Sequence, residues 1–109
     1  MSITINIYYT GNTIGKAAAF AEEMEQSGLA DRIRAEEGNL RYEYFMPIFD
    51  KKTVLLIDSW KNQKALDIHH ASPMMAEIAA LREKYDLHMK VEKYIGDDSQ
   101  PDDKQFIRE

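Results

Sequence analysis

The residues of this chain that could take part in chemistry gather around one apolar run of the sequence. A lone tryptophan, Trp60, ends that run, and His69 and His70 follow it. A neutral imidazole can accept a proton near pH 7, so His69 is a candidate general base. An indole such as Trp60 can stack on a planar ligand. The alternatives are a histidine that packs at a helix end and a tryptophan that only fills the core, and the sequence leaves both open.

Three polar residues on expected strands could line the same site. Asn6 lies on the polar face of its strand, where its amide could bind a carbonyl or phenolate oxygen. Tyr42 could lend a hydroxyl group or fill the core. Asp58 interrupts an apolar run, and a buried carboxylate needs a partner. The predicted site therefore has one catalytic residue, His69, and four substrate-binding residues: Asn6, Tyr42, Asp58 and Trp60.

Metal and phosphate sites find no support in the sequence. His69 and His70 are adjacent, so on a helix they point about 100° apart and cannot chelate one ion. The chain has no Cys, which removes thiolate chemistry and Cys-type zinc sites. The glycines after the first strand lack the lysine and the spacing of phosphate-binding loops. We therefore expect no metal and no cofactor.

Length and charge narrow the class of protein. A chain of 109 residues forms one domain, and its net charge of −5 argues against nucleic acid as the main partner. No apolar run reaches the roughly 18 residues that span a bilayer, and the first residues do not resemble a signal peptide. We expect a cytoplasmic protein with no membrane partner.

Hydrophobic periodicity predicts the elements that position these residues. Residues 3–9 alternate as a strand, and residues 13–26 carry a helical stripe that begins at Ile14. A second helical piece runs to about residue 36, with Gly38 as its C-terminal cap. Residues 40–46 form a strand whose inner face begins at Leu40. Residues 53–60 are apolar on both faces, which predicts a strand buried on both sides.

The second half of the chain repeats the helix–strand order. Asn62 can cap a short helix that carries His69, and Ser72 can cap another that begins at Pro73. Residues 87–95 alternate as a strand. The order βαββαβ predicts a ferredoxin-like α+β fold with a four-stranded antiparallel sheet and helices on one face. We expect a domain over residues 1–95, and an acidic tail over residues 96–109 that docks on the partner of a dimer.

A dimer is expected because helices cover only one face of such a sheet. The other face would expose a large apolar patch in water. Two sheets packed face to face in a symmetric homodimer would cover it. The predicted assembly is a dimeric α/β barrel.

The whole pattern from Ile3 to Ile95 resembles the antibiotic biosynthesis monooxygenase superfamily. The resemblance rests on the run Glu37-Gly38-Asn39-Leu40 that leads to Tyr42, on Trp60 at the end of the third strand, and on His69 followed by Ser72-Pro73. It implies a dimeric α/β barrel and a small stand-alone quinol monooxygenase that works without a cofactor. The superfamily also includes isomerases that process a phosphorylated autoinducer-2 signal, and heme-degrading oxygenases.

The resemblance leaves three functions to weigh. The first is a cofactor-free monooxygenase of a quinol or related aromatic substrate. The second is an isomerase or lyase of a small carbonyl compound, phosphorylated or not, and the third is a non-catalytic ligand-binding stress module. The heme-degrading branch fits poorly, because Asn6 and Trp60 match its pattern but Ala79 stands where that branch has a histidine.

Overall fold

The computed structural model describes residues 1–96 of the chain. Along the chain the elements are β1 (Ile3–Thr10), α1 (Lys16–Gln26), α2 (Leu29–Arg34), β2 (Asn39–Phe45), β3 (Thr53–Trp60), α3 (Gln63–His70), α4 (Met74–Lys84) and β4 (His88–Ile95). The strands form one antiparallel sheet in the order β2-β3-β1-β4. This confirms the predicted ferredoxin-like fold. The predicted docking of residues 97–109 lies outside the described residues.

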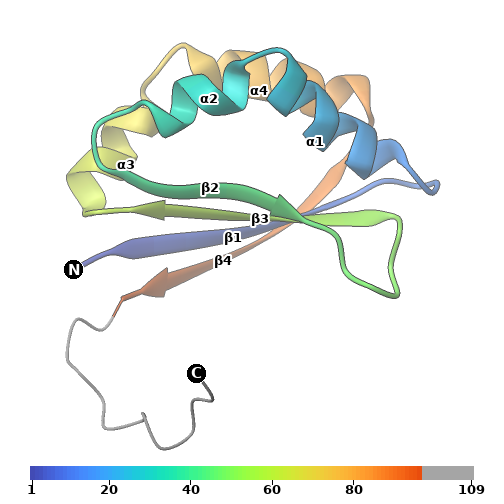
Figure 1. Cartoon of the computed structure of the whole chain (residues 1–109), viewed down its shortest axis with the longest axis horizontal. Helices are drawn as coiled ribbons and strands as arrows, with labels where there is room; N and C mark the ends of the chain where they lie inside the picture. Colours follow the sequence, from blue (N-terminus) through green and yellow to red (C-terminus); the bar gives the residue numbers. More distant parts are fainter. Residues whose placement is uncertain (97–109) are drawn as a thin grey trace, which may run out of the picture.

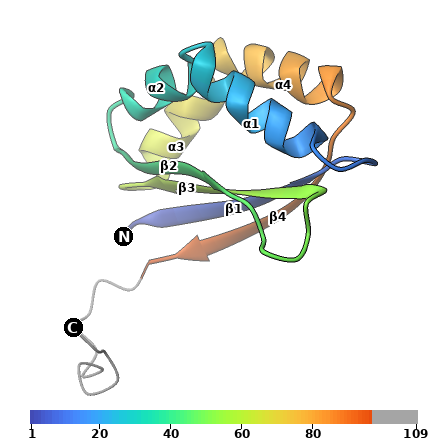
Figure 2. The same ribbon diagram turned by 45° about the vertical axis from the view of Figure 1, so that its right-hand side comes forward.

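All four helices lie over the same face of the sheet, as Figures 1 and 2 show from two directions. No described element covers the opposite face, which we call the open face. On the covered face the core includes Ile3, Ile5 and Tyr9 of β1. Phe20 of α1 packs on Tyr9 with ring centroids 4.7 Å apart. The sheet therefore has one face packed against helices and one without a layer of its own.

Strand β3 was predicted to be buried on both sides, but among the described residues only its covered face is fully buried. Because side chains alternate along a strand, Val54 and Leu56 face the helices while Leu55 and Ile57 face the other way. Val54 and Leu56 are buried, and Leu55 and Ile57 are half-buried within a single chain. The central strand thus offers apolar surface to the open face as well as to the core.

Three expectations about single residues are wrong, each for a local reason. Leu40 is exposed, because the pairing of β2 with β3 shifts by one residue between Asn39 and Arg41. Ile14 is also exposed, because α1 begins only at Lys16. Ser72 does not cap α4, since the N-cap position belongs to Pro73 and the Ser72 hydroxyl has no partner among the described residues.

Gly38 has a different role from the predicted helix cap. Helix α2 already ends at Arg34, and Gly38 lies in the turn before β2 with φ +85°. A Cβ atom at Gly38 would come within 2.6 Å of the Cβ atom of Ala65 on α3. Its carbonyl accepts the Lys61 backbone N–H at 2.8 Å. Glycine is required here because it lets this turn lie directly against the start of α3. Asn62 caps α3 as predicted, accepting the Ala65 N–H at 2.9 Å.

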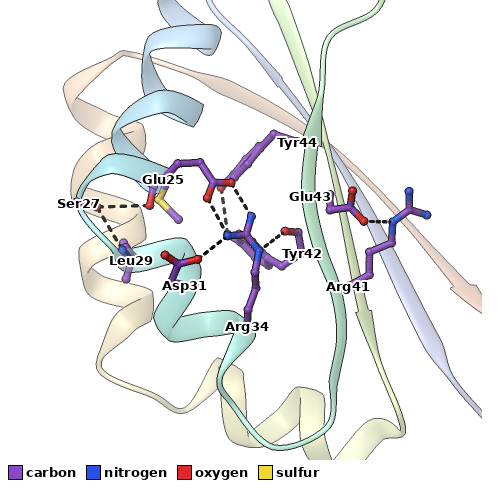
Figure 3. Close-up of polar contacts among 10 residues, drawn as sticks. Glu25, Ser27, Leu29, Asp31, Arg34, Arg41, Tyr42, Glu43 and Tyr44 are labelled. Carbon is purple, nitrogen blue, oxygen red and sulfur yellow. Dashed lines mark hydrogen bonds and ion pairs between the residues drawn. The ribbon is translucent and has the colours of Figure 1, made fainter.

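Arg34 joins three elements on the outer side of the domain (Figure 3). Its guanidinium donates to both carboxylate oxygens of Glu25 on α1, and to Asp31 within α2 at 2.9 Å. Its Nε donates to the Tyr42 carbonyl on β2 at 2.8 Å. The Arg34 side chain is 33% exposed, so these charge-assisted bonds are partly shielded from water. Arg34 therefore fixes α2 against both α1 and the edge strand.

We predict that Arg34→Ala lowers the free energy of unfolding by about 2–3 kcal/mol, because it leaves Glu25 and a strand carbonyl without their partner. Arg32→Ala is the matched control on the same helix. Arg32 also forms a bidentate salt bridge, with Glu77, but its side chain is 55% exposed. The loss in the free energy of unfolding should therefore stay below about 1 kcal/mol. Urea denaturation of the two variants and the wild type measures both values. Equal losses would contradict the role given to Arg34.

Candidate functional site

His69 lies at the end of α3 with its ring buried against the α2–β2 turn. Only 3% of the residue is exposed. Its Nδ1 atom lies 2.8 Å from Oε1 of Glu36, a side chain that is itself 15% exposed. The neighbouring His70 is exposed. The structure therefore selects His69 as the histidine that belongs to an internal site.

Trp60 forms one wall of this site. Its indole is fully buried and stacks on the His69 ring, with centroids 4.7 Å apart and an angle of 25° between the planes. The residue is placed there by the pairing of β1 with β3, which sets Trp60 opposite Ile3 on the covered face. The stacking keeps the imidazole plane within 25° of the indole plane and restricts how the ring can turn.

Asp58 lies two residues earlier on the same face of β3 and is also buried. Burial raises its pKa to about 7, because a charged carboxylate loses hydration there, and the charge of Glu36 adds to the shift. The Trp60 indole N–H lies close enough to oppose the shift. Yet neither Oδ1 of Asp58 nor Nε1 of Trp60 has a hydrogen-bond partner among the described residues. The site thus contains an acceptor and a donor that are both unsatisfied.

Tyr42 occupies the position on β2 that pairs with Asp58. It is buried, and its hydroxyl lies 3.1 Å from the hydroxyl of Tyr44. Burial raises the pKa of Tyr42 well above its usual value, so its hydroxyl stays protonated. The structure therefore brings Tyr42, Asp58, Trp60 and His69 together on the covered face.

Asn6 is not part of this group. Its strand neighbours Ile5 and Ile7 pack into the core beneath the helices. Since side chains alternate along a strand, Asn6 lies on the open face, where it pairs with Ile57 of β3. Its Oδ1 atom is buried without a partner among the described residues. The predicted contact of Asn6 with a ligand beside Trp60 is therefore not supported by its position.

The nearest opening to the buried group is a pocket of about 470 Å³ beside α3. Its lining residues come from the α2–β2 turn and from the start of α3: Glu36, Glu37, Lys61, Asn62, Lys64, Ala65 and Ile68. Glu36 belongs both to this lining and to the contact with His69. The pocket and the buried histidine therefore meet at one carboxylate.

Residues 1–96 contain neither a membrane-spanning helix nor a cluster of metal-ligating side chains. None of the helices described is long and apolar enough to cross a bilayer. Within the same residues, no three His, Cys, Asp or Glu side chains come together in a way that could hold a metal ion.

Comparison with known proteins identifies the family. The sequence model described as "Antibiotic biosynthesis monooxygenase" matches residues 2–81, most of the chain. The chain belongs to the antibiotic biosynthesis monooxygenase family. A curated relative, "Putative monooxygenase YcnE" of Bacillus subtilis (strain 168), is 33% identical over 46 residues, which are 42% of this chain. The match spans about half the length of that relative (48%).

Solved structures of the antibiotic biosynthesis monooxygenase family share the fold. SnoaB from Streptomyces nogalater, a cofactor-independent oxygenase, superimposes with a TM-score of 0.73 at 13% identity, covering 93% of this chain and 98% of SnoaB. A "putative antibiotic biosynthesis monooxygenase" from Deinococcus radiodurans gives 0.74 at 18% identity, covering 90% and 96% of the two chains. At these identities the likeness establishes the architecture alone.

One residue of this member of the antibiotic biosynthesis monooxygenase family escaped the sequence analysis. Glu36 is the only side chain among the described residues that hydrogen-bonds His69, and it was not predicted as a site residue. The available signal was the acidic pair Glu36-Glu37 in front of Gly38. The sequence could not tell which of the two turns inward, because that depends on where α2 ends.

We predict that Asp58→Asn raises stability above that of the wild type at pH 8 but not near pH 4. The folded pKa of about 7 lies above the unfolded value of about 3.9, so between these values the folded chain holds a proton that the unfolded chain has lost. The wild-type free energy of unfolding therefore falls as pH rises, by up to about 1.4 kcal/mol per pH unit, and levels above pH 7. In Asp58→Asn the free energy of unfolding does not fall in this way, because the side chain has no proton to lose.

Urea denaturation of both proteins at several pH values measures the difference. Asp67→Asn, which removes an exposed carboxylate from α3, controls for the loss of one negative charge. A difference between Asp58→Asn and the wild type that stays constant from pH 4 to pH 8 would contradict the raised pKa of Asp58.

Proposed function

We propose that this chain is a cofactor-independent monooxygenase that oxidises a quinol or a related aromatic compound with O₂. The single observation that carries the proposal is the buried His69, stacked on Trp60 and joined through Nδ1 to a carboxylate. Family membership supports it. His69 is the base that removes the phenolic proton, and the electron-rich anion then reacts with O₂.

The unsatisfied atoms of the site suit a phenolic hydroxyl group. Such a group accepts a hydrogen bond from an N–H and donates one to a carboxylate oxygen. Nε1 of Trp60 and Oδ1 of Asp58 lack these two partners. Leaving buried polar atoms unpaired costs about 1–3 kcal/mol each. A quinol has two hydroxyl groups, so the one that His69 does not deprotonate would gain affinity by pairing with both atoms.

The reaction balances without an external reductant. A quinol and O₂ give a hydroxyquinone and water: one oxygen atom enters a ring carbon in place of hydrogen, and the other leaves as water. The substrate supplies all four electrons. His69 takes the hydroxyl proton at the start, and this proton leaves the protein with the water that forms.

A pocket of about 470 Å³ is large enough for a single-ring aromatic compound. Ala65 and Ile68 offer it apolar contacts, and Glu36 links the pocket to the buried imidazole. Lys64, whose charge also acts on the carboxylate of Glu37, lines the pocket as well. A cation there favours the second candidate function, isomerisation of a small phosphorylated carbonyl compound, in which His69 would also be the base.

We predict that His69→Gln lowers kcat for quinol-dependent O₂ uptake by about 10²–10⁴-fold, because the variant removes the base but keeps a side chain of similar size. His70→Gln is the matched control: it changes the adjacent, exposed histidine and should stay within a few-fold of the wild type. An oxygen electrode with a panel of reduced quinones measures both rates. Normal O₂ uptake by His69→Gln would show that His69 is not the catalytic base.

The same panel separates the candidate functions. An oxygenase consumes O₂ and produces nothing under strictly anaerobic conditions. Turnover of a sugar phosphate without O₂ would identify the isomerase, and ligand binding without turnover of either class would identify a binding module. Each result excludes the other two functions.

We also propose that the chain acts as a homodimer joined through its open face. In the observed register Phe45, Leu55 and Tyr8 form one row across β2, β3 and β1, and Ile57 lies beside Asn6 in the next row. This apolar centre has no covering element among the described residues (Figure 2). A second copy would cover it, and would also enclose the unpaired Asn6 amide oxygen.

We predict that Leu55→Glu converts the protein from a dimer to a monomer, because it places two charges at the centre of the proposed interface. Ile68→Glu, on the helix side of the domain, is the matched control and should remain dimeric. Sedimentation equilibrium at micromolar concentration measures the mass, and circular dichroism checks the fold. A monomeric wild type, or a dimeric Leu55→Glu, would contradict the proposed interface.

A further inference from the structure

We infer that Glu36 is a positioning residue that holds His69 in the tautomer with its proton on Nδ1, so that Nε2 is the nitrogen that takes the substrate proton. The inference rests on the proposed function for its catalytic meaning. The tautomer itself is a property of the free protein and can be measured without a substrate.

The contact between the two side chains defines the tautomer. A carboxylate can only accept hydrogen bonds, so a separation of 2.8 Å between Oε1 of Glu36 and Nδ1 of His69 requires a proton on Nδ1. In a neutral imidazole the other nitrogen then carries a lone pair. No hydrogen bond joins Nε2 to a described residue, so Nε2 is the nitrogen that can take a proton.

Glu36 is held at its backbone as well as at its side chain. Its N–H donates to the Ile33 carbonyl at 3.0 Å, and its own carbonyl accepts the Asn39 N–H at 3.1 Å. Gly38, two residues later, rests against Ala65 of α3. The carboxylate is therefore fixed relative to α3 before any ligand binds, as a group that orients a base must be.

The other charged groups near His69 come from three elements. Asp58 approaches from β3, where burial raises its pKa and the charge of Glu36 adds to the shift. His70 and Asp67 belong to α3 itself, and Lys93 of β4 lies near His70. None of them is hydrogen-bonded to His69, so Glu36 alone among the described residues can set its tautomer.

Glu37 provides a control that the chain itself supplies. It differs from Glu36 by one position, but its side chain is 91% exposed and pairs with Lys61 at 3.0 Å. Glu36→Gln and Glu37→Gln remove the same charge from the same turn. Only the first changes the group that contacts His69.

The experiment is long-range ¹H–¹⁵N NMR of the imidazole groups at alkaline pH. The chain has three histidines, so His70→Gln and His88→Gln assign the His69 signals. In the wild type and in Glu37→Gln we expect Nε2 without a proton. In Glu36→Gln the amide can donate as well as accept, so we expect the form protonated on Nε2 to become populated. With quinol, kcat should fall roughly 10²-fold in this variant, with KM little changed.

The wild-type spectrum alone can overturn the inference: a proton on Nε2 of His69 would do so even if Glu36→Gln failed to fold. An unchanged tautomer in a folded Glu36→Gln would overturn it as well. The expected tautomers without O₂ uptake from any quinol would support the role of Glu36 in setting the tautomer and refute the proposed oxygenase. The tautomer and the oxygenase activity can therefore fail independently, and the two failures give different results.

Discussion

Strand β3 in the middle of the sheet is apolar on both faces, but the helices within residues 1–96 cover only one of them (Figure 1). Val54 and Leu56 are buried under that layer, whereas Leu55 and Ile57 are left half-buried on the open face. Burial of apolar area contributes about 25 cal/mol per Å², so an uncovered patch in a small domain is a substantial missing contribution to stability. The covered face thus holds the internal polar group, and the open face is where the proposed second copy would pack.

On the covered face, polar groups are buried in a domain that has little stability to spare. The structure limits the cost in two different ways. His69 and Glu36 satisfy each other through a 2.8 Å contact, so their burial is compensated directly. Oδ1 of Asp58 has no such partner among the described residues, and burial instead raises the pKa of Asp58 to about 7, which favours its uncharged form. Asp58 therefore changes its protonation state near neutral pH. The burial of His69 is compensated by its contact with Glu36.

The order of the elements was predictable, because the alternating and helical periods of this sequence are clear. The break between α1 and α2 is also visible in the sequence, since a glycine, Gly28, stands there. The composition of the site was only partly predictable. Trp60 and Asp58 share the covered face with Ile3 and Ile5 because of the register between β1 and β3, and no residue pattern states that register. The same register separates Asn6 from Trp60, although the family resemblance had joined them. The one-residue bulge that exposes Leu40 has no sequence signature here either.

A buried base must return the proton that it takes before it can act again. In the proposed mechanism the burial of His69 would slow this return, and the position of Glu36 bears on that step. Glu36 contacts Nδ1 on one side and lines the pocket on the other, so one residue separates the imidazole from the opening. Asp58 lies on the sheet and is absent from the pocket lining. The two carboxylates are therefore placed differently: Glu36 lies between the imidazole and the pocket, whereas Asp58 is set back from the pocket beside Trp60.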